Sequence, residues 1–164
     1  MRRLNLEAIA NIAIVFVSVL FVGVLAHKYF TVSKAYPTPI GEKATISDFD
    51  WEKNKYTVIL ALQKDCRLCS ESAGFYRQLL SEISKLQKIA VIGVLPDPID
   101  TSQEYLHQIG VRVDVIKRMP LSTLKVAGSP SILIVDKTGK IVNGWVGKLS
   151  PQEEQNVVAT LNNL

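Results

Sequence analysis

The chain alternates between continuous apolar runs and stretches with helical spacing of apolar residues. Runs rich in β-branched and other apolar residues at 56–62, 89–95 and 132–135 predict strands buried on both faces. Apolar residues recur at helical spacing after position 66 and again near the C-terminus. A strand, a helix and a second strand at this spacing predict a βαβ unit with parallel strands, and hence an α/β domain.

Polar residues between these runs predict turns and helix starts. Asp136-Lys137-Thr138-Gly139 has hairpin composition, so the strand over 140–146 is expected to run antiparallel to the strand before it. The sheet is therefore expected to be mixed. Two spacings are typical of capping boxes at helix starts, with Thr101 and Glu104 in one and Ser150 and Glu153 in the other.

The N-terminal part of the chain differs in composition. Residues 9–26 include no charged side chain, and about 18 helical residues span close to the hydrocarbon core of a bilayer. We expect a cytoplasmic N-terminus at 1–8, a transmembrane signal-anchor at 9–26, a linker at 27–41 and a folded domain at 42–164. A cleaved signal peptide is the alternative, and either would deliver the domain outside the cytoplasm.

Length and charge restrict the possible functions. The 164 residues suffice for one domain with a hydrophobic core and a short appendage. The formal net charge is +4, but charges of both signs are scattered along the chain and no basic block with interleaved aromatics occurs. This distribution argues against nucleic-acid binding.

The chain's only two cysteines, Cys66 and Cys69, stand where the first buried strand ends and a helix begins. The first turn of a helix has free N–H groups and a partial positive charge, which stabilise the nucleophilic thiolate. Cys69 lies one turn on and can reach back to form a disulfide. Half a zinc site and two inert thiols are the alternatives, but zinc needs four ligands, and His27 and His107 form no second close pair.

Gly128-Ser129-Pro130-Ser131 directly precedes the strand over 132–135. Proline cannot donate to the ladder of a central strand, so it is tolerated only at a strand start such as this one. A cis Ser129–Pro130 bond would mark a shaped turn here, and an ordinary trans proline is the alternative.

The order of these motifs resembles the thioredoxin fold. With its N-terminal anchor the chain resembles the membrane-tethered TlpA/ResA-type thiol–disulfide oxidoreductases of the redoxin superfamily. The resemblance covers about residues 41–164 and rests on the segments 66–69, 128–131 and 135–140. It implies a thioredoxin-like α/β fold, with a central mixed sheet flanked by helices and preceded by one transmembrane helix.

The resemblance also assigns roles to residues. It implies that Cys66 is the exposed attacking cysteine and Cys69 the buried resolving one. Pro130 corresponds to a cis-proline packed against the disulfide, and Ser129 would offer its backbone to an extended substrate segment.

The sequence departs from the family pattern beside the cysteines. Asp65 stands where an aromatic residue is usual, and Leu68 where proline is common. The Asp65 carboxylate would disfavour a thiolate and Arg67 would favour it, so both are expected to influence the site. The candidates for a proton acceptor for Cys69 are Glu52, Glu71 and Asp65.

The resemblance implies extracytoplasmic thiol–disulfide exchange that reduces, or alternatively oxidises, protein disulfides. It implies no cofactor and no metal. The expected partners are disulfide- or dithiol-containing proteins, a redox partner that recycles the pair, and the bilayer around residues 9–26. The expected location is a single-pass cell-membrane protein with its domain on the periplasmic or outer side.

Two other functions share this fold. Peroxiredoxin-like peroxide reduction would need a proline and a threonine shortly upstream of Cys66, where Gln63-Lys64-Asp65 stand instead. A non-enzymatic copper-binding or delivery module would use the two soft thiolates, but His107 is not obviously placed as a third ligand.

Overall fold

The computed structural model describes residues 6–31 and 38–164, which belong to two separate compact units. Helix α1, Leu6–Thr31, contains the uncharged segment 9–26, and its side chains at 11–23 are exposed within its own unit. Among the described residues, no helix combines the length and the apolar character needed to cross a membrane. Positions 1–5 of the expected N-terminal tail and 32–37 of the expected linker lie outside the described residues.

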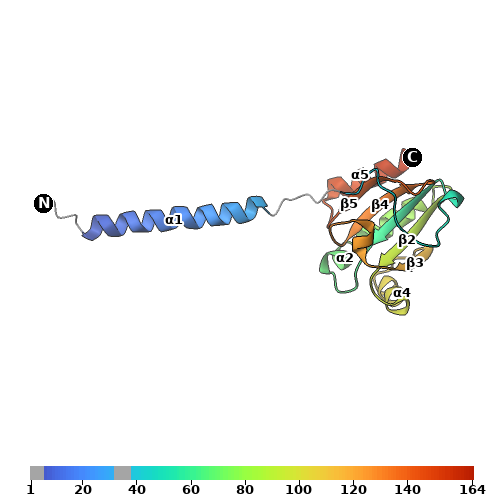
Figure 1. The fold of residues 1–164 in the computed structure, drawn as a ribbon, viewed down its shortest axis with the longest axis horizontal. Helices are drawn as coiled ribbons and strands as arrows, with labels where there is room; N and C mark the ends of the chain where they lie inside the picture. Colours follow the sequence, from blue (N-terminus) through green and yellow to red (C-terminus); the bar gives the residue numbers. More distant parts are fainter. Residues whose placement is uncertain (1–5, 32–37) are drawn as a thin grey trace. The chain divides into compact units, whose positions relative to one another are not determined.

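The second unit is built on a five-stranded mixed sheet with the strand order β3-β2-β1-β4-β5 (Figure 1). Strands β1, β2 and β3 are parallel, whereas β4 runs antiparallel to both β1 and β5. The predicted α/β fold with a mixed sheet and a returning hairpin is thus confirmed. The strands are β1 Tyr56–Ala61, β2 Ile89–Leu95, β3 Val115–Arg118, β4 Ser131–Asp136 and β5 Ile141–Val146.

Strand β1 explains why the central runs are apolar without interruption. Val58 and Leu60 belong to the hydrophobic cluster on one face of the sheet, and Ile59 and Ala61 belong to the cluster on the other. All four are fully buried. Because side chains alternate between the two faces of a strand, a strand covered on both faces carries apolar residues at consecutive positions, here Val58 to Ala61.

The two faces of the sheet are covered differently. The domain has four α-helices (Figure 1): α2 Arg67–Glu71, α3 Ala73–Ile83, α4 Ile99–Gln108 and α5 Pro151–Asn162. It also has two short 3₁₀ helices, η1 Trp51–Lys53 before β1 and η2 Leu121–Leu124 between β3 and β4. Leu79 of α3 and Leu161 of α5 pack in the cluster with Val58. The other cluster is completed by irregular chain, including Ile46 and Val126.

The single helix expected after Cys66 is two helices, α2 and α3, which meet at Ser72. Ser72 has φ −87° and ψ 0°, close enough to helical values that the apolar spacing continues across the break. Strand β3 begins only at Val115, after an irregular segment over 111–114. The Asp114 carboxylate accepts a hydrogen bond from the Val91 N–H (2.7 Å), where a continuing strand would supply a backbone carbonyl.

One of the two predicted capping boxes is wrong. Helix α4 begins at Ile99, with Pro98 at its N-cap and no side-chain cap. Pro98 fixes φ at −53°, which suits a helix entry, and the Ser102 hydroxyl donates to the Asp97 carbonyl (3.3 Å) from inside the first turns. Thr101 therefore lies within the helix and caps nothing.

The second capping box, at Ser150 and Glu153, is confirmed. The Ser150 N–H and hydroxyl donate to the Glu153 carboxylate at 2.8 and 2.7 Å. These hydrogen bonds, the backbone one foremost, hold the pKa of Glu153 below its ordinary value of 4.5. Because the folded pKa is lowered, the box stabilises the domain above pH 4.5, and this stabilisation disappears as pH falls through the folded pKa.

We therefore expect Ser150→Ala to raise the pKa of Glu153 towards its ordinary value and to destabilise the domain at pH 7 by about 1 kcal/mol. The difference in unfolding free energy between the variant and the parent chain should shrink below the folded pKa, because a protonated carboxyl accepts a weaker hydrogen bond from the Ser150 hydroxyl. A ¹³C titration of Glu153, with urea unfolding at pH 7 and pH 3, measures both effects. An unchanged Glu153 pKa in the variant would show that the Ser150 hydroxyl does not bind this carboxylate in solution.

Candidate active site

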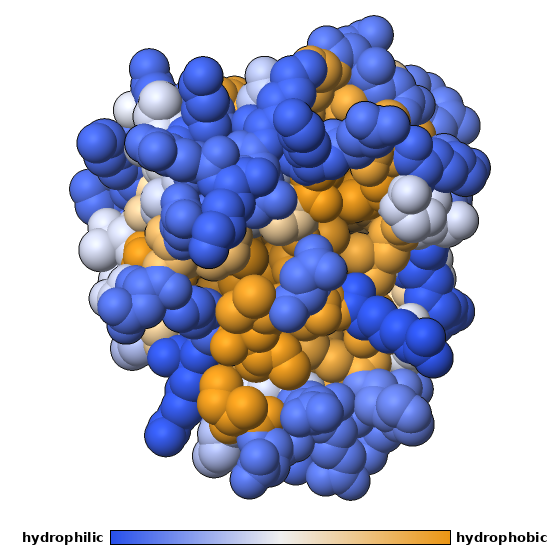
Figure 2. All heavy atoms as spheres, turned by 90° about the vertical axis from the view of Figure 1, so that its right-hand side faces the viewer, coloured by the Kyte–Doolittle hydropathy of each residue, from blue (hydrophilic) through white to orange (hydrophobic). Residues whose placement is uncertain are grey.

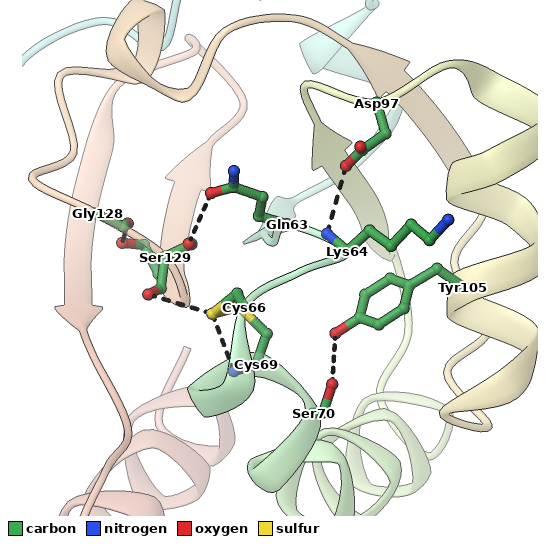
Figure 3. Close-up of a disulfide and its surroundings, with 10 residues drawn as sticks. Gln63, Lys64, Cys66, Cys69, Ser70, Asp97, Tyr105, Gly128 and Ser129 are labelled. Atoms are coloured by element: carbon green, nitrogen blue, oxygen red, sulfur yellow. Dashed lines mark hydrogen bonds between the residues drawn. A yellow bond between two sulfur atoms is a disulfide. The ribbon is translucent and has the colours of Figure 1, made fainter.

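The two cysteines lie at the carboxyl end of β1, where α2 begins (Figure 3). They are joined by a disulfide, with their Cα atoms 5.2 Å apart. Cys66 is the N-cap residue of α2 and is half-buried, whereas Cys69 has no exposed surface. The predicted location at a strand–helix junction is confirmed, and one sulfur is more accessible than the other.

One backbone N–H of α2 points at the sulfur of Cys66, and another at its carbonyl. The Cys69 N–H donates to Cys66 Sγ (3.1 Å), and the Ser70 N–H donates to the Cys66 carbonyl (3.2 Å). When the disulfide is reduced, a donor aimed at this sulfur stabilises negative charge on it. The local geometry therefore favours Cys66 as the attacking thiolate.

The Ser129–Pro130 loop faces the disulfide although it is more than 60 positions away in the chain (Figure 3). The Ser129–Pro130 bond is cis, as the resemblance to the thioredoxin fold implied and not the ordinary trans alternative. Cys66 Sγ lies 3.6 Å from the Ser129 carbonyl oxygen. The Gly147 N–H donates to the Pro130 carbonyl (2.7 Å), which ties this loop to the end of β5. The structure thus brings together the two motifs that sequence reasoning singled out separately.

The charged residues beside the cysteines lie on the surface. Asp65 and Arg67 are exposed, and the Arg67 guanidinium pairs with the Glu71 carboxylate (3.0 Å). Lys148 also pairs with Glu71 (2.8 Å). The hydrogen bond and the positive charge of Lys148 hold the pKa of Glu71 below its ordinary value. An exposed carboxylate engaged by two cations is poorly suited to accept a proton from buried Cys69.

The other acids proposed for that role are no better placed. Glu52 is exposed in η1, which precedes β1 and so lies at the end of that strand remote from Cys66. Asp65 is exposed in the loop before α2. Cys69 itself belongs to the apolar cluster of the helical face, with neighbours such as Leu60 and Phe75.

Sequence reasoning missed several polar contacts around the site (Figure 3). The Lys64 N–H donates to Asp97 Oδ2 (3.3 Å), and the hydroxyls of Tyr105 and Ser70 lie 3.3 Å apart. Asp97 could have been found, because parallel β1 and β2 end at the same edge of the sheet. Tyr105 gave no signal, because its helical position shows only that it faces the core.

A further contact joins the loops on either side of the disulfide. The Ser129 hydroxyl donates to Gln63 Oε1 at 3.5 Å (Figure 3). His107 is exposed on α4, where it lines a groove with β3. Within the described ranges, no three His, Cys, Asp or Glu side chains lie close enough to hold a metal ion.

Comparisons with known proteins bear on the fold. No protein-family model matches the chain, and no curated protein matches it in sequence. Among solved structures, it resembles a protein described as a candidate thiol:disulfide interchange protein DsbE from Chlorobium tepidum, with 17% identity, a TM-score of 0.61, and coverage of 77% of this chain and 98% of the other.

Two more solved structures show the same likeness. The thioredoxin domain of a thiol-disulfide oxidoreductase from Bacteroides vulgatus has 16% identity, a TM-score of 0.57, and coverage of 74% of this chain and 96% of the other. A DsbF homologue from Corynebacterium diphtheriae has 16% identity, a TM-score of 0.55, and coverage of 76% and 82%. The chain therefore has a thioredoxin-like fold, and this fold carries a Cys-x-x-Cys disulfide facing a cis-proline.

Proposed function

We propose that the domain catalyses thiol–disulfide exchange through Cys66 and Cys69. The observation that carries the proposal is the asymmetry of the pair: a half-buried sulfur at a helix start, facing the Ser129–Pro130 loop, is bonded to a fully buried one. In such a pair, Cys66 can form a mixed disulfide with a partner, and Cys69 can then resolve it. Structural neighbours described as thiol-disulfide oxidoreductases support the same chemistry.

In the reducing direction, the Cys66 thiolate attacks one sulfur of a substrate disulfide. A mixed disulfide forms, and the second substrate sulfur leaves as a thiolate that takes up a proton. The Cys69 sulfur, once deprotonated, attacks Cys66 Sγ and releases the first substrate sulfur. Two electrons pass to the substrate, and the Cys66–Cys69 disulfide is restored.

We propose protein disulfides as substrates and reduction as the main direction, with oxidation as the same steps reversed. A membrane or extracytoplasmic redox partner would then reduce the pair after each turnover. The exposed Asp65 and Arg67 and the half-buried Ser129 form the surface that a substrate meets at Cys66, and the buried Pro130 supports the turn behind it. No observation at the site favours peroxide reduction or copper delivery.

The direct test mixes the reduced full chain with native insulin, whose chains are joined by disulfides. Dithiothreitol is supplied, and precipitation of the freed insulin chains is followed. The parent chain should accelerate precipitation, and Cys66→Ser should match the rate with dithiothreitol alone. A matched control is Glu52→Gln, an exposed change in η1 remote from Cys66. Parent activity equal to that of Cys66→Ser would contradict the proposal.

We also propose that residues 9–26 anchor the chain in the cell membrane, with the domain on the extracytoplasmic side. The support is the sequence, which has no charge over these residues and Arg2 and Arg3 before them. The described side chains of α1, at 11–23, are exposed and mostly apolar, but they account for only about 20 Å of helix. The proposal therefore also depends on residues at both ends of this stretch.

Replacing Val15 and Val19 by lysine should release the chain from membranes, because each lysine near the centre of a spanning helix costs roughly 3 kcal/mol. The measurement is the fraction of full chain that stays in the membrane pellet after carbonate extraction. The parent chain should remain in the pellet and the double variant should not. Release of the parent chain by carbonate would contradict the anchor without affecting the exchange chemistry.

A further inference from the structure

Two buried hydroxyls at the junction of α2 and α3 have no hydrogen-bond partner among the described residues. Polar side chains cover much of the domain surface, as Figure 2 shows for one side of it. The hydroxyls of Ser72 and Tyr76 lie in the interior instead, on residues that are 6% and 1% exposed, and neither is hydrogen-bonded. Because an unpaired polar group is costly to bury, these two hydroxyls need a physical reason.

Two other buried hydroxyls of the domain are paired. The Ser131 hydroxyl donates to the Gly128 carbonyl (2.7 Å), and the Ser102 hydroxyl donates to the Asp97 carbonyl (3.3 Å). Ser72, by contrast, is the N-cap of α3 but forms no capping hydrogen bond through its side chain. In the disulfide form, its hydroxyl therefore contributes nothing to the start of that helix.

Ser72 and Tyr76 lie on the same helical face as Cys69. The Ser72 N–H donates to the Leu68 carbonyl and the Tyr76 N–H to the Ser72 carbonyl, both at 3.1 Å, so helical hydrogen bonds continue across the junction. Cys69, Ser72 and Tyr76 are thus three and four residues apart along one stripe. Because helical side chains lean towards the N-terminus, Tyr76 covers the turn that holds Ser72, and Ser72 covers the turn that holds Cys69.

The phenol of Tyr76 is a permanent hydrogen-bond donor. Tyr76 and Cys69 share the apolar cluster between the sheet and its helices. Burial there raises the pKa of Tyr76 above its ordinary value of 10.0, so the phenol keeps its proton. The Ser72 hydroxyl offsets part of this rise, which places it near the phenol, although the two do not form a hydrogen bond of normal geometry.

The redox state of Cys69 explains why these hydroxyls are unpaired. In the disulfide, Cys69 Sγ is bonded to Cys66 Sγ and is only a weak acceptor. In the resolving step, Cys69 becomes a thiolate, and a thiolate among apolar side chains is disfavoured unless a donor reaches it. The carboxylates considered above are exposed, whereas Ser72 stands one helical turn after Cys69.

We propose that Ser72 and Tyr76 form a hydroxyl relay that stabilises the Cys69 thiolate during resolution. The Ser72 hydroxyl donates to Cys69 Sγ, and the Tyr76 hydroxyl donates to the Ser72 oxygen, which strengthens the first hydrogen bond. The Cys69 proton passes to solvent, the Cys66–Cys69 bond forms as the Cys66–substrate bond breaks, and the released substrate sulfur takes up a proton. Tyr76 is a positioning residue, since it acts through Ser72. The relay rests on the proposed exchange function.

The test follows resolution by Cys69 in the full chain in detergent micelles. The reduced chain is mixed with excess Ellman's reagent in a stopped-flow instrument. One coloured thionitrobenzoate is released when Cys66 attacks the reagent, and a second when Cys69 resolves the mixed disulfide. The rate of the second phase is independent of reagent concentration and follows the fraction of Cys69 present as thiolate, so it is measured against pH.

Ser72→Ala should change the shape of this pH profile. Loss of a hydrogen bond to the charged sulfur lowers the thiolate fraction about tenfold at pH 7, but the more basic thiolate is about threefold more nucleophilic. The variant should therefore be about threefold slower than the parent chain at pH 7 and about threefold faster where Cys69 is fully ionised, so the profiles cross. Coincident profiles, or slower resolution at every pH, would overturn the proposal.

Tyr76→Phe removes only the second hydroxyl of the relay. It should shift the profile in the same direction by less, and it should add nothing to Ser72→Ala, because the relay is then already interrupted. Tyr56→Phe is the matched control, since Tyr56 packs against the same cluster from the start of β1, at the end remote from Cys66. Additive effects of Ser72→Ala and Tyr76→Phe, or an equal shift in the control, would overturn the relay.

Unfolding of the oxidised chain in urea supplies a second readout. Because neither hydroxyl is paired in the disulfide form, Ser72→Ala and Tyr76→Phe should not lower the urea midpoint. A lowered midpoint in both variants would show that the hydroxyls serve the oxidised fold, which would overturn the proposal. A parent chain that releases only one thionitrobenzoate would contradict the exchange function and the relay with it, whereas two releases with unaltered variants would contradict the relay alone.

Discussion

A full chain with Cys69→Ser should accumulate mixed disulfides through Cys66, whereas Cys66→Ser should form none. Cys66 is half-buried at the start of α2, and the Cys69 N–H lies 3.1 Å from its sulfur, so a thiolate there is both accessible and stabilised. Cys69 is fully buried and reaches only the Cys66 sulfur. Without Cys69, the intermediate loses its intramolecular route to resolution.

The measurement is non-reducing electrophoresis of the full chain, after acid quenching and alkylation, with native disulfide-linked insulin as the partner. Adducts should be abundant in Cys69→Ser, rare in the parent chain and absent from Cys66→Ser and from the double variant. Adducts of similar abundance in the two single variants would show that the cysteines are equivalent. That result would contradict the assignment of Cys66 as attacking and Cys69 as resolving.

The largest effect on stability is expected from Leu79→Ala. Leu79 has no exposed surface and packs with Val58 and Leu161 in the cluster between the sheet and its helices. Removing a buried leucine side chain costs about 2–5 kcal/mol, against a total domain stability of roughly 5–15 kcal/mol. The variant should therefore lose a large fraction of its stability.

Leu80→Ala is the matched control, because Leu80 is the next residue of α3 and only partly buried. It should cost roughly 1 kcal/mol. The chain has two tryptophans, and they pack against the hydrophobic clusters on opposite faces of the sheet, Trp145 on one and Trp51 on the other. Their fluorescence in urea therefore reports unfolding on both faces. Equal losses for the two variants would contradict the orientation of α3.

The sequence predicted those elements that are marked by a continuous apolar run or by the spacing of a helix cap. Strand β2 has the bounds expected from its apolar run, and Ser150 caps α5 as its spacing to Glu153 indicated. These features depend on neighbours within a few residues. The break at Ser72 was not predictable from spacing, because a single residue with ψ near 0° leaves the apolar positions in phase.

Features that depend on tertiary contacts were partly predictable. The resemblance to the thioredoxin fold implied that Cys66 faces the Ser129–Pro130 loop, and Cys66 Sγ lies 3.6 Å from the Ser129 carbonyl oxygen. The late start of β3 depends on Asp114 reaching the Val91 N–H, a contact that no local pattern encodes. Asp97 and Tyr105 approach the active site only because α4 packs beside α2, so their contribution required the fold.

An equilibrium redox titration of the full chain, read by alkylation of Cys66 and Cys69, is the most direct test of thiol–disulfide exchange by this domain. Thiol–disulfide exchange through this pair predicts one reversible two-electron transition in which both cysteines change together. A midpoint near −270 mV, about that of thioredoxin, would support reduction of substrates, and one near −120 mV would support oxidation. The absence of a reversible transition, or independent titration of the two cysteines, would contradict thiol–disulfide exchange as the function of this domain.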